Sequence, residues 1–159
     1  MKTAIYYFSG TGNSLALAKE LAKELGESEI YQISKIMKMV KGTDKKFSPS
    51  AERIVIVTPV YVSGLPNIVA DFAGRIRIGE GKKAYAIATY GGMAGKVLLM
   101  LDEIMKKEGP GLSAGFLVRM PGNCITLYSA SSKSKQDELF RIAKLKIKDI
   151  AKQIAEGVD

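Results

Sequence analysis

Short apolar runs and longer amphipathic segments follow each other along this chain, and their order predicts alternating strands and helices. The short runs are rich in aromatic and β-branched residues, which is typical of strands. They cover residues 3–8, 29–33, 54–57, 84–89 and 113–118. Residues 54–57 are continuously apolar, as expected of a parallel strand that is covered on both faces.

Helical periodicity fills most of the segments between these runs. Residues 13–25 place three leucines on one face, and Gly26 ends the predicted helix. Further helices are predicted at about residues 67–75, after Pro66, and at residues 136–155. Another helix has an apolar stripe at i, i+3, i+4, i+7 and i+8, formed by Val97, Met100, Leu101, Ile104 and Met105.

The predicted order of elements indicates an α/β fold. Five strands that alternate with helices favour an open parallel sheet with helices on both faces. The basic segment after residue 33 gives no prediction of its structure, and residues 121–135 are expected to form a polar loop. Since the sequence contains no internal repeat or linker, residues 1–159 are expected to form one domain.

The composition limits the chemistry that the side chains alone can perform. The chain has 159 residues, with one cysteine, Cys124, and no histidine. This excludes an internal disulfide, a cysteine-rich or histidine metal centre, and a Ser-His-Asp triad. Any reaction is therefore expected to depend on a bound cofactor. The short apolar stretch at the start breaks into a polar turn without a cleavage site, which favours a cytoplasmic protein without a membrane span.

The net charge is +8, and part of the excess is clustered. Residues 35–46 contain five lysines and one acidic residue, and residues 133–152 contain seven basic and three acidic residues. Two interpretations remain open: solvated surfaces, or a docking face for an acidic partner or an anionic substrate. Nucleic acid is not an expected partner, because no nucleic-acid motif accompanies the charge.

A turn of six small polar residues joins the first strand to the first helix. In a parallel sheet, ligands bind beyond the carboxyl ends of the strands. A helix start also offers unpaired N–H groups and partial positive charge, which suit a phosphate. A simple helix cap would explain one or two of these residues, but not six. The predicted phosphate-binding residues are Ser9, Gly10, Thr11, Gly12, Asn13 and Ser14.

The turn differs from two common nucleotide-binding motifs. The pattern GxxxxGK[ST] is absent, and the turn contains no lysine, so nucleoside triphosphates are disfavoured. The dinucleotide pattern GxGxxG matches at Gly10 and Gly12 but has Leu15 in place of its third glycine. This departure weakens an NAD or FAD interpretation.

Two further loops carry aromatic residues and glycines at the ends of predicted strands. Tyr61 follows the third strand, and Tyr90 follows the fourth. Aromatic faces and backbone N–H groups suit a flat isoalloxazine ring. The alternative is that both tyrosines are ordinary loop residues. The second predicted set of binding residues is Pro59, Val60, Tyr61, Val62, Ser63 and Gly64, and the third is Thr89, Tyr90, Gly91 and Gly92.

These three loops together resemble those of flavodoxins, most of all the flavodoxin half of flavodoxin–ferredoxin fusion proteins. The resemblance implies a three-layer fold with strand order 2-1-3-4-5, bound FMN, and electron transfer. It places the phosphate in the first loop and the ring between the other two. An iron–sulfur centre is not implied for this chain, since one cysteine cannot hold a [4Fe–4S] cluster. The basic charge then suggests an acidic redox partner, such as a ferredoxin or a reductase.

Two alternatives to an electron carrier remain open. One is an NAD(P)H-dependent flavin or quinone reductase, an oxidoreductase on the same fold. The other is a module that binds phosphate or another anion without redox chemistry.

The resemblance also raises a question about the loop after Tyr61. In flavodoxins a peptide there turns over, which favours a residue with positive φ, and glycine adopts that conformation at least cost. This chain has Val62 and Ser63 before Gly64. Because a β-branched residue at positive φ is an outlier, we expect Val62 to resist it and the flavin to tend toward two-electron transfer. A shift of register onto Gly64 is the alternative.

Overall fold

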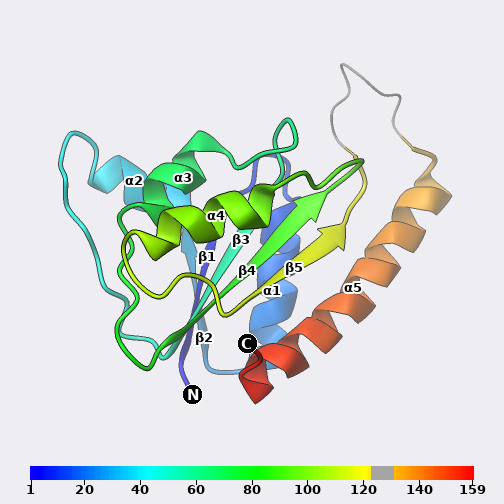
Figure 1. The fold of residues 1–159 in the computed structure, drawn as a ribbon. Coiled ribbons are helices and arrows are strands. Elements are labelled where there is room, and N and C mark those ends of the chain that lie inside the picture. Colours follow the sequence, from blue (N-terminus) through cyan, green and yellow to red (C-terminus); the bar gives the residue numbers. More distant parts are fainter. Residues whose placement is uncertain (123–130) are drawn as a thin grey trace.

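The computed structural model describes residues 1–122 and 131–159, and its centre is a parallel sheet of five strands (Figure 1). The order across the sheet is β2-β1-β3-β4-β5, which confirms the prediction. The strands are β1 (Thr3–Tyr7), β2 (Ser28–Gln32), β3 (Arg53–Pro59), β4 (Lys83–Tyr90) and β5 (Ala114–Arg119).

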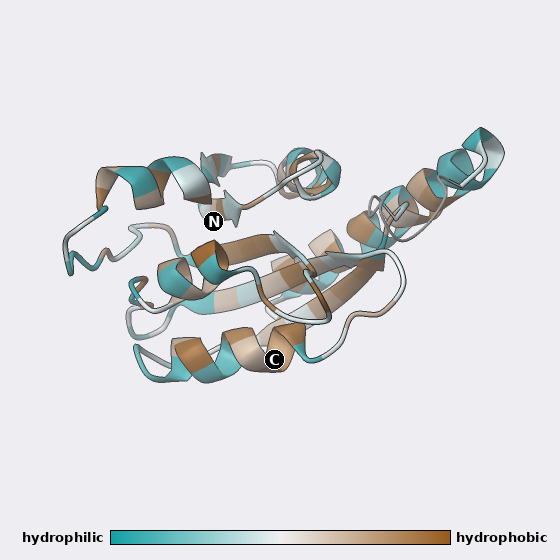
Figure 2. Ribbon diagram, turned by 90° about the horizontal axis from the view of Figure 1, so that it is seen from above, coloured by the Kyte–Doolittle hydropathy of each residue, from teal (hydrophilic) through white to brown (hydrophobic). Residues whose placement is uncertain are grey.

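Five helices cover the two faces of the sheet in the described residues. They are α1 (Asn13–Leu25), α2 (Ile33–Met39), α3 (Asn67–Ala73), α4 (Val97–Lys106) and α5 (Lys133–Glu156). Helices α1 and α5 pack on one face, and α2, α3 and α4 lie on the other (Figure 1). In Figure 2 the strands in the middle are largely hydrophobic, whereas the helices alternate hydrophobic and hydrophilic residues.

The continuous apolar run in β3 follows from this arrangement. Ile54 and Ile56 lie in the core under α3 and α4, while Val55 and Val57 lie in the core under α1 and α5. All four side chains are fully buried. Successive residues of a strand face opposite sides, so a strand with two covered faces needs apolar residues at every position.

The structure fills one gap in the predicted elements and corrects two predictions. The unpredicted basic segment begins with α2, a helix of seven residues. Residues 133–135 belong to α5 and not to a loop, because Ser132 caps the helix and its side chain accepts a hydrogen bond from the Lys135 N–H. Met100 lies outside the core and is 40% exposed. Residues 121–122 and 131–132 lie outside helices and strands, as predicted, and the part of the predicted loop at 123–130, which includes Cys124, lies outside the described residues.

The two basic clusters lie on opposite faces of the sheet. The first cluster includes α2, whose Ile33 is buried with α3 and α4. The second follows α5, whose Ile147 is buried with α1. They therefore form two separate basic surfaces. No helix in the described ranges is long and apolar enough to span a membrane.

Candidate functional site

The three predicted loops meet at the carboxyl edge of the sheet. We call them the first loop (residues 9–14), the second loop (residues 59–64) and the third loop (residues 89–92). They surround a cavity of about 40 Å³, which has room for a few water-sized groups. The residues that line it are Ser9, Gly10, Thr11, Asn13, Ser14, Pro59, Val60, Tyr61, Thr89, Tyr90, Gly91, Met120 and Pro121.

The first loop leaves the start of α1 open to a ligand. Gly12 is the N-cap residue with a φ of 102°, in the left-handed region that glycine adopts most readily. Its N–H donates to the Ser9 hydroxyl oxygen at 3.0 Å, and no side chain caps the helix. The first N–H groups of α1 therefore keep their hydrogen-bonding capacity and their partial positive charge.

Two predicted phosphate donors instead connect the first loop to its neighbours. The Asn13 side-chain amide donates to the Pro121 carbonyl oxygen at 3.1 Å. The hydroxyls of Ser14 and Thr89 are hydrogen-bonded to each other at 3.0 Å, and both residues are buried. The first turn of α1 packs beside Thr89 and Pro121, so these side chains have protein partners while they also line the cavity.

Tyr61 lies across the first loop. A Cβ atom added to Gly10 would lie 2.3 Å from the Tyr61 hydroxyl oxygen, so a larger residue at position 10 would have to displace the Tyr61 side chain. The Tyr61 ring also packs edge-on against Phe8, with 6.1 Å between ring centroids. It is 46% exposed and presents an aromatic surface at the rim of the cavity.

The second loop contains a tight turn with two residues at positive φ. Tyr61 and Gly64 exchange backbone hydrogen bonds of 3.0 and 2.9 Å, while Val62 has φ 49° and Ser63 φ 59°. Both central residues of a type I′ turn take positive φ. The expectation that Val62 resists this conformation, and the alternative of a shift onto Gly64, are therefore wrong. The argument for two-electron transfer loses its basis.

The third loop is connected to both neighbouring strand ends. The Val60 N–H donates to the Thr89 carbonyl oxygen at 2.9 Å, and the Met120 N–H donates to the Tyr90 carbonyl oxygen at 2.8 Å. Arg119 donates from Nε to the Gly91 carbonyl oxygen at 3.2 Å. These bonds hold the second and third loops at fixed positions beside the first.

Eleven of the sixteen predicted residues line the cavity. Five do not: Gly12, Val62, Ser63, Gly64 and Gly92. Gly12 shapes the first loop, and residues 62–64 form the outer part of the tight turn. Sequence reasoning missed Met120 and Pro121, although they follow the fifth strand at the edge where ligands bind. No group of three metal-ligating side chains occurs among the residues described.

The family comparison finds a match over most of the chain. A family model described as a flavodoxin domain matches residues 4–108. Among curated proteins, none matches significantly.

Solved structures share the fold at low sequence identity. A Streptococcus pneumoniae TIGR4 flavodoxin is 14% identical, with a TM-score of 0.61, 99% of this chain covered and 100% of the other. A flavodoxin from the domain Archaea is 16% identical, with a TM-score of 0.53 and coverages of 96% and 99%. An FMN-dependent NADH-azoreductase from Bacillus anthracis, solved with FMN, is 14% identical, with a TM-score of 0.60 and coverages of 98% and 100%. At these identities the likeness shows the fold alone.

Proposed function

Since this chain belongs to the flavodoxin domain family, we propose that it carries electrons in the cytoplasm through a noncovalently bound FMN. The observation that carries the proposal is the meeting of three features at one cavity: an uncapped helix start, a glycine turn, and an exposed tyrosine at the rim. The cavity lies where β1 and β3 are neighbours in the sheet. The helix that follows β1, α1, and the helix that follows β3, α3, cover opposite faces of the sheet. Such a switch point is where ligands bind in open α/β sheets.

The residues fit the two ends of FMN. The phosphate needs donors, which the N–H groups at the start of α1 and the Thr11 hydroxyl supply. The enclosed volume of about 40 Å³ suits a small polar group but not a ring system. The ring is therefore assigned to the open rim, beside Tyr61 and the third loop.

Each group of residues has a separate task in this proposal. When bound, FMN supplies the redox chemistry, and the protein supplies binding and orientation. The first loop holds the phosphate. Asn13 and Ser14 hold that loop against Pro121 and Thr89, and Tyr61 covers one side of the ring position.

The visible spectrum of the purified protein tests this function. We expect a yellow protein that releases FMN on denaturation, and an apoprotein that takes up one FMN per chain. A colourless protein that takes up no added flavin would contradict the proposal and favour an anion-binding module. Steady oxidation of NADH or NADPH with a quinone acceptor would favour a flavin or quinone reductase.

The basic surface of α5 is proposed to guide an acidic redox partner, such as a ferredoxin. Lys133, Lys135, Lys146 and Lys148 form no ion pair with any other residue of the described ranges, and all are exposed. Their charge therefore remains available to attract an acidic protein over several ångströms.

Reversing charge on α5 is expected to slow the association with an acidic ferredoxin by about tenfold or more, as is usual when electrostatic guidance is lost. The change is Lys144, Lys146 and Lys148 to Glu, measured by stopped-flow mixing. Raising salt from 0.1 to 1 M should also slow association, because the Debye length falls from about 10 to about 3 Å.

The matched control applies the same charge change on the opposite face. It replaces Lys35, Lys38 and Lys41 by Glu, on and just after α2. We expect a smaller effect from this control. Equal slowing by both triple variants would show a response to net charge only, and no slowing by either would leave both clusters as solvated surfaces.

A further inference from the structure

A groove of about 340 Å³ lies along one edge of the sheet, away from the three loops. It runs between the edge strand β2, its neighbour β1 and the chain segment 47–51, with α2 at its side. Its walls are mainly apolar and include Tyr6, Tyr31, Met39, Phe47 and Pro49. No residue lines both this groove and the cavity at the three loops.

Packed aromatic rings form the inner wall of the groove. Tyr31 stacks on Tyr6 with 5.2 Å between ring centroids and 20° between ring planes. The Tyr6 ring in turn packs against Phe72, and Phe72 packs against Phe47. The distance between ring centroids is 5.1 Å in each pair. Because each ring is held by the next, the groove offers flat surfaces that require little rearrangement to accept another ring.

Tyr6 lines the groove, and its hydroxyl is hydrogen-bonded to no other residue in the described part of the chain. Tyr6 is 7% exposed. Burial, assisted by the nearby Tyr31 and Glu29, raises the pKa of Tyr6 to about 12. The hydroxyl therefore keeps its proton at neutral pH and is available as a donor.

The charged groups at the rim are already paired with one another. The Lys2 ammonium lies 2.8 Å from the Glu29 carboxylate, and the Tyr31 hydroxyl donates to the same carboxylate. The groove thus has little net charge to offer an ion. The Tyr6 hydroxyl is a neutral polar group in this wall that is not paired with another described residue.

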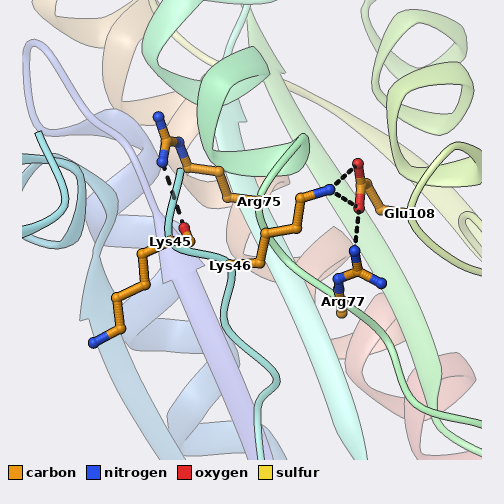
Figure 3. A network of polar contacts seen from close by, with 5 residues as sticks. All are labelled: Lys45, Lys46, Arg75, Arg77 and Glu108. Atoms are coloured by element: carbon orange, nitrogen blue, oxygen red, sulfur yellow. Dashed lines mark hydrogen bonds and ion pairs between the residues drawn. The ribbon is translucent and has the colours of Figure 1, made fainter. Parts of the chain in front are cut away.

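The outer wall is fastened to the body of the protein. The Phe47 N–H donates to the Arg75 carbonyl oxygen at 3.0 Å, and the Arg77 N–H donates to the Phe47 carbonyl oxygen at 2.9 Å. Beside them, Glu108 accepts from Lys46 at 2.6 Å and lies 3.6 Å from Arg77 (Figure 3). These contacts hold the segment that closes the groove.

We propose that this groove binds a neutral, flat aromatic molecule that carries a carbonyl or hydroxyl oxygen, and that the Tyr6 hydroxyl hydrogen-bonds to that oxygen. The volume lies at the lower end of the range for small-molecule sites, which suits one or two fused rings. The stacked tyrosines select a flat shape, and the paired rim charges select a neutral molecule. This site does not depend on the function proposed for the three loops.

The test compares 2-naphthol with 2-methylnaphthalene, which has the same shape but no hydrogen-bonding group. Each is titrated into the purified protein and followed by amide chemical shifts in ¹H–¹⁵N NMR spectra. We expect shifts in β1, β2 and residues 47–51, and tighter binding of 2-naphthol by about two- to tenfold, as for one net hydrogen bond.

The variant Tyr6→Phe keeps the ring and removes the hydroxyl. It should abolish the preference for 2-naphthol and leave the affinity for 2-methylnaphthalene unchanged. Tyr85→Phe is the matched control, because it removes a tyrosine hydroxyl that is unpaired among the described residues but is buried in the core under α1 and α5, away from the groove. Absence of shifts at the groove, shifts confined to the three loops, or an unchanged preference in Tyr6→Phe would overturn the proposal.

Discussion

Replacing Thr11 by alanine is expected to weaken FMN binding by about ten- to a hundredfold and to leave riboflavin binding unchanged. The two ligands differ by the phosphate, and Thr11 is an exposed residue of the first loop that lines the cavity. A hydrogen bond to a charged group contributes about 1.5–3 kcal/mol, which corresponds to this loss of affinity. Fluorescence titration of the apoprotein with each flavin measures the two dissociation constants.

Thr11→Ser is the matched control for this prediction, since it removes the methyl group and keeps the hydroxyl. It should preserve the preference for FMN over riboflavin. An equal loss of affinity for FMN and riboflavin in Thr11→Ala would remove this hydroxyl from the phosphate site. The backbone N–H groups of α1 would then be its main donors.

The sheet could be predicted because its strands have covered faces that leave a clear pattern in the sequence. The apolar run in β3 is continuous because two helical layers cover it. The helix α1 was predicted with its observed bounds, Asn13–Leu25, because its apolar face is regular and Gly26 ends it. By contrast, α2 has seven residues and buries only Ile33 fully, which is too short a pattern to recognise.

At the candidate site, the sequence predicted which loops come together but not where their side chains point. Asn13 and Ser14 have the chemistry of phosphate donors, yet their partners are Pro121 and Thr89, far along the chain. Such pairings depend on how closely α1 packs against β4 and β5. The local sequence around residue 13 does not show how closely these elements pack.

The second loop shows the tertiary structure overriding a local preference. Glycine is the usual residue at positive φ, but Val62 and Ser63 both take this conformation. A residue in a sparsely populated φ/ψ region lowers stability by on the order of 1–3 kcal/mol. Such a conformation persists only when the surrounding structure holds it in place. Here the surroundings are the paired hydrogen bonds between Tyr61 and Gly64, and the close backing of the turn by Gly95.

Gly95 backs this turn at a distance that no larger residue permits. It has a φ of 59°, and a Cβ atom added to it would lie 1.9 Å from the Ser63 carbonyl oxygen and 2.7 Å from the Ser63 carbonyl carbon. Both are backbone atoms, so rotation of a side chain cannot relieve the overlap. The contact joins the second loop to the segment just before α4, and Met100 of α4 lies beside Gly64 in the same region.

Gly95→Ala is therefore expected to lower the free energy of unfolding by about 3 kcal/mol. The left-handed conformation costs an L-residue about 1–2 kcal/mol, and overpacking adds about 1–3 kcal/mol. Gly92→Ala is the matched control, because Gly92 is not at positive φ and a Cβ there would meet no atom within 4 Å. It should change stability by less than about 0.5 kcal/mol. Urea unfolding followed by circular dichroism measures both variants, with the slope of the transition expected to stay unchanged.

Gly95→Ala should also differ from Thr11→Ala in how it changes the binding of the two flavins. Moving the turn displaces Tyr61, which we assign to the ring and not to the phosphate. Gly95→Ala should therefore weaken the binding of riboflavin and of FMN by the same factor, whereas Thr11→Ala should weaken the binding of FMN alone. If Gly95→Ala is as stable as Gly92→Ala and binds both flavins normally, the turn and the segment before α4 do not pack as closely as the structure has them. If it weakens FMN more than riboflavin, the second loop contributes to the phosphate site.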